Sequence, residues 1–358
     1  MQDIIVNDDS YWMWKIVFDD AATLIALSNN SDGGIMWANL PYYSFFVYEV
    51  LHKLLHEYDD KDYFDKIKKY RNSLKIFSEK YSPSIRTMNG VREQHDHFFQ
   101  KQLRIPFADK LDINYDLGIY FDADGQIIYN TQMAGNLSFN QYGLSNTEAF
   151  SFGKKTGEAI SAIYLKLQKY YKPEAIGLKQ KIYCSYYLDI NTSREKLIFN
   201  LENGLDVNMY LLHMYSWLGY VRNVLCKELM PNNNWLIRMK FIAIYNIERG
   251  LSTLKRYYNG QKEIPGIIHK IKDKEIDWKI QAYTKLRNCM MHYGLEVNGK
   301  YFLNSGNAQP DKPLYGLIDS CIENETEPFF ERLDFELDEL YKLIGEEFSF
   351  NKRKLQRF

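Results

Sequence analysis

The sequence has few cysteines, and none of them forms a closely spaced pair. The four cysteines of this 358-residue chain stand far apart, at positions 184, 226, 289 and 321. A zinc ribbon requires CxxC-type pairs, and disulfide frameworks are typical of short, cysteine-dense secreted chains. The cysteine pattern therefore excludes a zinc ribbon and favours a reducing compartment.

An excess of charge of one sign is also missing. Lys and Arg together number 45 and Asp and Glu number 46, which leaves a net charge of -1. This balance argues against a protein that coats long stretches of nucleic acid, although it is compatible with local contacts to a few phosphates. With 46% hydrophobic and 25% charged residues, the composition is that of an ordinary globular protein.

Long apolar runs are absent as well. The uncharged segment 125–147 is rich in Asn, Gln and Ser, and the more apolar segment 33–48 contains Asn39 and Pro41 and is too short to cross a bilayer. The acidic N-terminus lacks the order of a signal peptide. We expect a soluble cytoplasmic protein without a membrane partner. No Walker A, GxGxxG or GxSxG motif occurs, so common nucleotide-binding and hydrolase classes are not indicated.

Helical periodicity dominates what is present, so the predicted fold is mainly α. Residues 112–130 differ, because two apolar runs flank Asp122-Ala-Asp-Gly125, which predicts a β-hairpin. We expect an N-terminal helical domain over 1–172, an extended linker over 173–194 and a C-terminal helical domain over 195–358. The predicted helices cover about 43–58, 62–81, 82–104, 147–171, 203–230, 233–258, 274–295 and 328–347.

Two Arg-x4-His motifs occur, Arg92…His97 and Arg287…His292, at corresponding places in the two halves. Arg287 lies within the apolar stripe of its predicted helix and has no acidic residue three or four positions away. A charge that faces a core without a partner is costly, so Arg287 should have a partner elsewhere or a functional role. Arg92, in contrast, has Asp96 four residues on as a pairing partner. The C-terminal motif is therefore the better candidate site.

Further polar residues accompany the C-terminal motif. Asn288 is four residues before His292 and shares its helical face, and Glu296, one turn beyond, is predicted to hold one imidazole nitrogen. Residues five apart on a regular helix point about 140° away from each other. Arg287 and His292 therefore converge only if the helix is irregular or if a second copy completes the site.

The segment KLRNCMMHYGLE resembles the signature of HEPN domains, which are helical bundles with Arg-x4–6-His and a polar residue directly after the Arg. Arg287, Asn288 and His292 match this signature. Arg92 and His97 match its spacing, with Glu93 in the polar position. The resemblance implies tandem HEPN-like helical bundles and a metal-independent endoribonuclease of toxin, abortive-infection or anti-phage defence type. It further implies a composite site, a homodimer formed through HEPN domains, a possible regulatory partner protein and no cofactor.

The residue types suit RNA cleavage. An imidazole exchanges protons near neutral pH, and a guanidinium stabilises charge on a phosphate, so no metal is required. The segment 255–287 is basic and rich in tyrosine, which is typical of contacts with single-stranded RNA. Its predicted RNA-binding residues are Lys279, Tyr283 and Lys285.

Other interpretations stay open. The chain is alternatively a non-catalytic HEPN-like dimer that acts as an interaction, scaffold or antitoxin-type protein, with Arg287 in an interface. Arg92 and His97 are alternatively structural residues. His52 and His56, with Glu49 on the same face, are a possible metal site, but no fourth ligand is evident and we predict no metal.

Overall fold

The computed structural model describes most of the chain as helix, as the sequence predicts. The described residues are 6, 10–55, 60–102, 116–133, 146–172, 176–192, 198–273, 280–297, 300–309, 312–322, 326–350 and 354–357.

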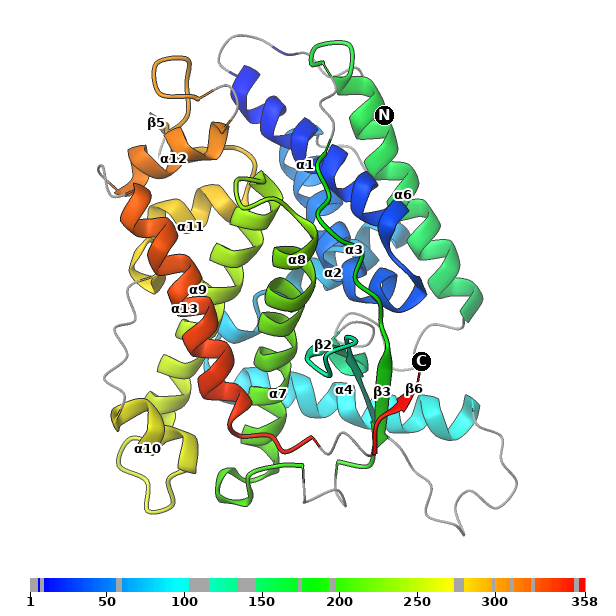
Figure 1. The fold of residues 1–358 in the computed structure, drawn as a ribbon, viewed down its shortest axis with the longest axis vertical. Coiled ribbons are helices and arrows are strands. Elements are labelled where there is room, and N and C mark those ends of the chain that lie inside the picture. The colour runs from blue at the N-terminus through cyan, green and yellow to red at the C-terminus, as the bar shows by residue number, and fades with distance from the viewer. Residues whose placement is uncertain are drawn as a thin grey trace.

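The N-terminal part builds a group of helices in which α1 packs against α6 and α2 against α3 (Figure 1). α2 begins at Gly33, ten residues earlier than predicted, because the Asp32 carboxylate caps it by accepting a hydrogen bond from the Ile35 N–H at 2.8 Å. Pro41 is tolerated inside this helix. A π-helical segment, η1, follows directly after Glu49. The elements are α1 (Tyr11–Asn30), α2 (Gly33–Glu49), η1 (Val50–Leu55), α3 (Lys61–Ser73), η2 (Ile76–Ser78), α4 (Tyr81–Gln102) and α6 (Asn146–Leu167).

The predicted hairpin is present and forms part of a small antiparallel sheet of order β2-β1-β3-β6. Its turn forms because the Asp122 carboxylate accepts hydrogen bonds from the N–H groups of Asp124 and Gln126, while Gly125 adopts a positive φ of 75°. The strands are β1 (Leu117–Phe121), β2 (Ile127–Asn130), β3 (Tyr186–Ile190) and β6 (Gln356–Arg357).

The C-terminal part is organised around the long helix α9, which packs against α7, α11 and α13 (Figure 1). Asn233 caps its first turn by accepting a hydrogen bond from the Leu236 N–H. The elements are η4 (Leu201–Asn203), α7 (Leu205–Gly219), η5 (Tyr220–Leu225), α8 (Cys226–Glu228), α9 (Asn234–Tyr257), α10 (Gly266–Asp273), η6 (Ile280–Ala282), α11 (Thr284–Met291), β4 (Glu296–Val297), β5 (Lys300–Tyr301), α12 (Pro313–Ile322) and α13 (Thr326–Gly345).

A single cluster of buried apolar residues runs through both predicted halves. Tyr42 of α2 stacks on Tyr220 of η5 with 4.3 Å between ring centroids, and Phe46 of α2 makes edge contacts with Trp235 and Tyr293. Aromatic contacts of this kind stabilise the junction beyond the burial of their area. α2 is thereby held against the segment that carries the C-terminal motif.

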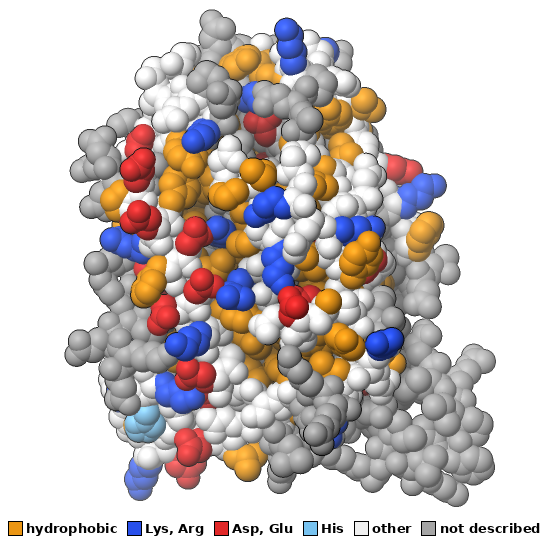
Figure 2. Space-filling view, viewed as in Figure 1, with side chains coloured by type: hydrophobic (Ala, Val, Ile, Leu, Met, Phe, Trp, Pro, Cys, Tyr) orange, Lys and Arg blue, Asp and Glu red, His pale blue; other side chains and the backbone are white. Residues whose placement is uncertain are grey.

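The surface that carries α13 shows acidic and basic side chains interspersed (Figure 2). Two exposed acids of α13 are paired, since Asp338 accepts from Arg222 at 2.6 Å and Asp334 pairs with Lys240. Within the described residues, no helix has the length and apolarity that a membrane span requires.

Candidate functional site

His292 lies at the end of a helix and not within one. α11 stops at Met291, and His292 has an extended backbone with φ -138° and ψ 135°. The prediction of one helix over 274–295 is therefore wrong in this part, and residues 274–279 lie outside the described residues. Gly294 and Leu295, which has a positive φ of 46°, continue the chain in a non-helical path. The 140° separation expected for a regular helix consequently does not apply to Arg287 and His292.

A buried network fixes the end of α11. Arg238 of α9 donates from Nε to Asp20 of α1 at 3.1 Å and from Nη1 to the Met290 carbonyl at 2.6 Å. The Tyr293 hydroxyl donates to the same Asp20 oxygen at 2.7 Å, and the Arg238 guanidinium lies 4.3 Å from the centre of the Tyr293 ring. Because the chain is anchored at Met290 before His292 and at Tyr293 after it, the imidazole is held in one place.

Glu49, the last residue of α2, holds His292. The Nδ1 atom of His292 lies 2.7 Å from Oε2 of Glu49, while Oε1 of Glu49 accepts a hydrogen bond from Nε of Arg71 at 2.6 Å. The Glu49 side chain is fully buried, whereas that of His292 is 30% exposed. Burial raises the pKa of Glu49, but the hydrogen bonds and charges of His292 and Arg71 outweigh burial and lower this pKa below its ordinary value.

An ionised Glu49 determines which nitrogen of His292 carries a proton. Its carboxylate is an acceptor, so Nδ1 of His292 must be the donor in this contact. The Nε2 atom on the opposite side of the ring is then the atom that exchanges protons. Among the described residues, none forms a hydrogen bond with Nε2.

Arg287 is half-buried and lies among other cations. Its Nη1 donates to the Asn288 side-chain oxygen at 3.0 Å, and its guanidinium lies 6.0 Å from the centre of the Tyr245 ring. Burial lowers the pKa of Arg287, and the positive charges of Arg71 and Arg249 lower it further. Among the residues that the structure describes, no carboxylate forms an ion pair with Arg287 within 4.0 Å. The partner that the sequence requires is therefore not an acid of the described chain.

The local charge is strongly positive. The charges of Arg71 and Arg249 act on Arg287, and the side chains of Arg249 and Arg287 both contact Tyr245. Arg249 is exposed and donates from Nη1 to the Tyr245 hydroxyl at 3.4 Å. Glu49 pairs with Arg71, so Arg287 and Arg249 leave an excess of positive charge that favours an anion, and guanidinium geometry suits phosphate oxygens in particular.

The other residues predicted for this site have different positions. Tyr283 precedes α11 and is half-buried, with its ring against Phe329 and its hydroxyl accepting a hydrogen bond from Arg332 at 3.0 Å. Lys285 is exposed on α11. Lys279 lies outside the described residues, and so does the side chain of Glu296, which belongs to β4. The contact predicted for Glu296 is made by Glu49.

The two Arg-x4-His motifs do not come together. Figure 1 places α4, which carries Arg92, across the lower part of the molecule and α11 in the upper left. Arg92 is half-buried, lies near Asp116, and has an Nη1 atom without a hydrogen-bond partner among the described residues. The side chains of Glu93, Asp96 and His97 lie outside the described residues.

In the alternative metal site of His52, His56 and Glu49, the Glu49 carboxylate is already engaged by other side chains. Glu49 binds His292 and Arg71, and the His52 ring packs 5.0 Å from Tyr48 and 5.8 Å from Phe64. His56 lies outside the described residues. Within the part of the chain that is described, no three His, Cys, Asp or Glu side chains gather as metal ligands.

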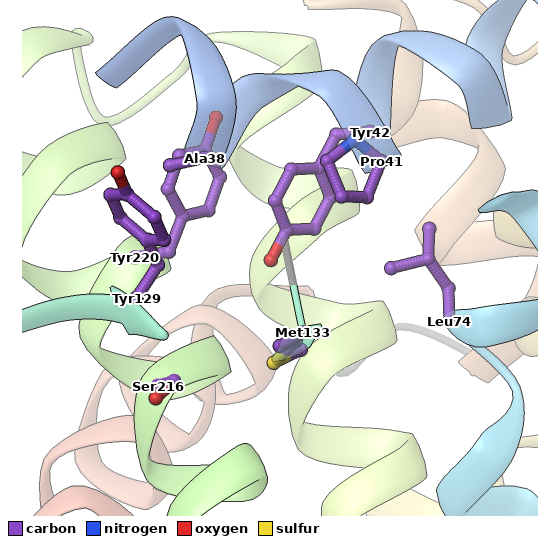
Figure 3. Close-up of a pocket in the computed structure, with 8 residues that line it drawn as sticks. All are labelled: Ala38, Pro41, Tyr42, Leu74, Tyr129, Met133, Ser216 and Tyr220. Atoms are coloured by element: carbon purple, nitrogen blue, oxygen red, sulfur yellow. The ribbon is translucent and has the colours of Figure 1, made fainter. Parts of the chain in front are cut away.

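Two hollows lie apart from this cluster. A small cavity of about 10 Å³ lies between α2, η5 and the sheet and has room for one water molecule, and Figure 3 shows the side chains that line it. A more open depression of about 320 Å³ lies between α1 and the start of α9, where the lining includes Asp19, Thr23 and Asn232. Neither hollow includes a residue of the Arg287–His292 cluster, so neither is its substrate pocket.

Comparisons with known proteins leave the site to be judged by its own geometry. No family model, curated protein or solved structure matches the chain. The HEPN resemblance therefore depends on the motif Arg287-Asn288-x3-His292 and on the mainly helical fold. Glu49, Arg71 and Arg249 are the cluster residues that sequence reasoning did not assign to this site, because no local pattern connects them to a motif more than 200 residues from Glu49 and Arg71.

Proposed function

We propose that this chain is a metal-independent endoribonuclease of the toxin or anti-phage defence type, with its centre at His292 and Arg287. The observation that carries the proposal is the contact between the buried Glu49 and Nδ1 of the part-exposed His292. It directs Nε2 to proton transfer, beside three guanidinium groups that favour a phosphate.

The chemistry follows from these positions. Nε2 of His292 accepts the proton of a ribose 2′-hydroxyl, the 2′-oxygen attacks phosphorus, and the bond from phosphorus to the 5′-oxygen breaks. Arg287 and Arg249 stabilise the negative charge that develops on the phosphate oxygens. The 5′-oxygen leaves with a proton, so the products carry a 2′,3′-cyclic phosphate and a 5′-hydroxyl.

The proposal includes tandem HEPN-like bundles and a homodimer. The N-terminal half contributes Glu49 and Arg71 to the motif of the C-terminal half, so the two halves of one chain share a single site. One imidazole serves the attacking side of the phosphate. In a homodimer, the second copy's imidazole supplies the proton to the 5′-oxygen on the opposite side.

The alternative is a helical scaffold or antitoxin-type protein in which Arg287 and His292 are buried by interface partners. A scaffold has no need of an oriented, part-exposed imidazole beside Arg287, which forms no ion pair with an acid among the described residues. These features favour the nuclease, and an RNA cleavage assay distinguishes the two functions.

The test is cleavage of end-labelled RNA and total tRNA in EDTA by the wild-type protein, His292→Ala and Arg287→Ala. We expect products with cyclic phosphate ends from the wild type and a loss of at least 100-fold in both variants. His269→Ala is the matched control, because this exposed histidine of α10 lies outside the cluster. Undiminished cleavage by His292→Ala would overturn the proposal, and a folded wild type without activity on any RNA would favour the scaffold.

A further inference from the structure

We propose that the C-terminal end of α9 forms a base-stacking subsite, centred on Tyr257, for a single RNA strand whose neighbouring phosphates lie at Arg249 and Arg287. This inference rests on the proposed function and specifies its substrate. The ligand of this subsite is a single-stranded polynucleotide that extends beyond the scissile bond.

The subsite begins with an exposed aromatic ring that is held rigidly. Tyr257 is 45% exposed, and its ring lies 4.9 Å from that of Tyr81 and 5.0 Å from that of Tyr258. Tyr81 is itself buried and makes an edge contact with Tyr210 at 5.2 Å. A ring fixed from behind and open in front provides a surface on which a base can stack without further ordering of the side chain.

The same helix connects this ring to the proposed centre. Arg249 precedes Tyr257 by eight residues, which corresponds to about 12 Å along an α-helix. Arg256 follows Arg249 by seven residues, so the two exposed guanidinium groups share one face of α9. At the other end, Arg249 donates to the Tyr245 hydroxyl at 3.4 Å, and the Arg287 guanidinium lies 6.0 Å from the centre of the same Tyr245 ring. Tyr257 lies about 80° round the helix from Arg249, so the path offers cations along one face and an aromatic ring at the edge of its far end.

The charge around the ring is of mixed sign. Asp206 lies near Tyr81 and Tyr258 and accepts a hydrogen bond from the Asn89 side chain at 3.3 Å. Simple attraction of phosphates is therefore weaker here than at the Arg287 cluster. Stacking must provide the contact, which requires an unpaired base, because the bases of a duplex are already stacked on each other.

The test measures binding separately from cleavage. Fluorescence anisotropy with the full-length protein would use labelled 2′-deoxy oligonucleotides, which lack the attacking hydroxyl, of two and of ten nucleotides. Loss of a stacked base should weaken binding of the ten-nucleotide strand to Tyr257→Ala by about 5- to 100-fold. Binding of the dinucleotide should be unchanged, since residues 249 and 257 are separated by about 12 Å along the axis of α9. Tyr257→Phe should bind both as the wild type does.

Tyr183→Ala is the matched control, because Tyr183 is another exposed tyrosine, 54% exposed, and it has a cationic side chain, Lys181, 5.2 Å from its ring centre. It should leave the affinity for both oligonucleotides unchanged. Equal affinity of Tyr257→Ala and wild type for the longer strand would overturn the subsite, and so would an equal loss in Tyr183→Ala.

A kinetic comparison distinguishes this failure from failure of the proposed function. For a ribonucleotide substrate of ten residues, Tyr257→Ala should raise KM and leave kcat unchanged. Cleavage with an unaltered KM would refute the subsite and retain the nuclease. Binding that depends on Tyr257 in a protein that cleaves no RNA would refute the nuclease and retain the subsite.

Discussion

Glu49→Gln changes one charge at the centre of the cluster and very little of its shape. In the wild type, Glu49 is fully buried and holds Nδ1 of His292 at 2.7 Å and Nε of Arg71 at 2.6 Å. A glutamine amide fits the same volume but presents both a donor and an acceptor. If its N–H₂ faces Nδ1, the proton of the imidazole is forced to Nε2, which can no longer accept one.

The magnitude has a catalytic and a structural part. Loss of the oriented general base should lower kcat by about 10²- to 10⁴-fold, with little change in KM, because Arg287 and Arg249 remain. The variant also leaves Arg71, which is only 6% exposed, without a charged partner. Removing one member of a buried ion pair costs about 3–5 kcal/mol of unfolding free energy. The glutamine oxygen still accepts from Arg71, so we expect a cost near the lower limit, about 3 kcal/mol.

The pH dependence provides a second readout. The pKa of Glu49 is lower in the folded protein than its ordinary value of 4.5, so its charge contributes stability that is fully present above this value. The contribution is lost as pH falls through the lower pKa of the folded state. The difference in unfolding free energy between wild type and Glu49→Gln should therefore be constant near neutral pH and shrink below about pH 4.5. Urea titrations at several pH values measure it.

A control separates catalysis from folding. Glu347 is also buried, pairs with Lys270 at 2.5 Å, and lies outside the cluster. Glu347→Gln should lower stability and leave kcat unchanged. A Glu49→Gln enzyme with kcat within about threefold of wild type would refute the assignment of Glu49 as the residue that orients His292.

Three further substitutions test other parts of the structure. Burial lowers the pKa of His213 to about 3, so below pH 6.5 the unfolded state binds a proton that the folded state does not. The free energy of unfolding should therefore fall as the pH decreases below 6.5. In His213→Leu, urea titrations should show a pH dependence that is shallower by up to about 1.4 kcal/mol per pH unit. Arg238→Met removes the charged partner of the buried Asp20 and the hydrogen bond that holds the end of α11. It should lower the free energy of unfolding by about 3–5 kcal/mol and also reduce RNA cleavage. Normal activity at full stability would contradict the role of Arg238 in positioning His292. Gly250→Ala places a Cβ 2.3 Å from the Met214 methyl, and it should lower the urea midpoint through a cost of about 1–3 kcal/mol.

Local signals predicted local structure well. Asp122 and Gly125 indicated the hairpin turn, and the structure shows the Asp122 carboxylate bound to the backbone N–H groups of that turn. The start of α2 was predicted ten residues too late, because Asp32 caps the helix at Gly33 and Pro41 is accommodated inside it. The continuous helix over 274–295 was predicted from apolar periodicity, which carries no information about the bond that Arg238 makes to the Met290 carbonyl.

By itself, the sequence determined that the chain is mainly helical and that Arg287, Asn288 and His292 lie within six residues of each other, because both properties depend on short separations along the chain. Only the tertiary structure decided what surrounds them. Glu49 and His292 are 243 residues apart, and their contact exists because α2 packs its aromatic side chains against Trp235 and Tyr293. Hydrophobic packing selects which helices meet, and it is not directional, so the polar contacts that result cannot be inferred from the periodicity of either helix alone.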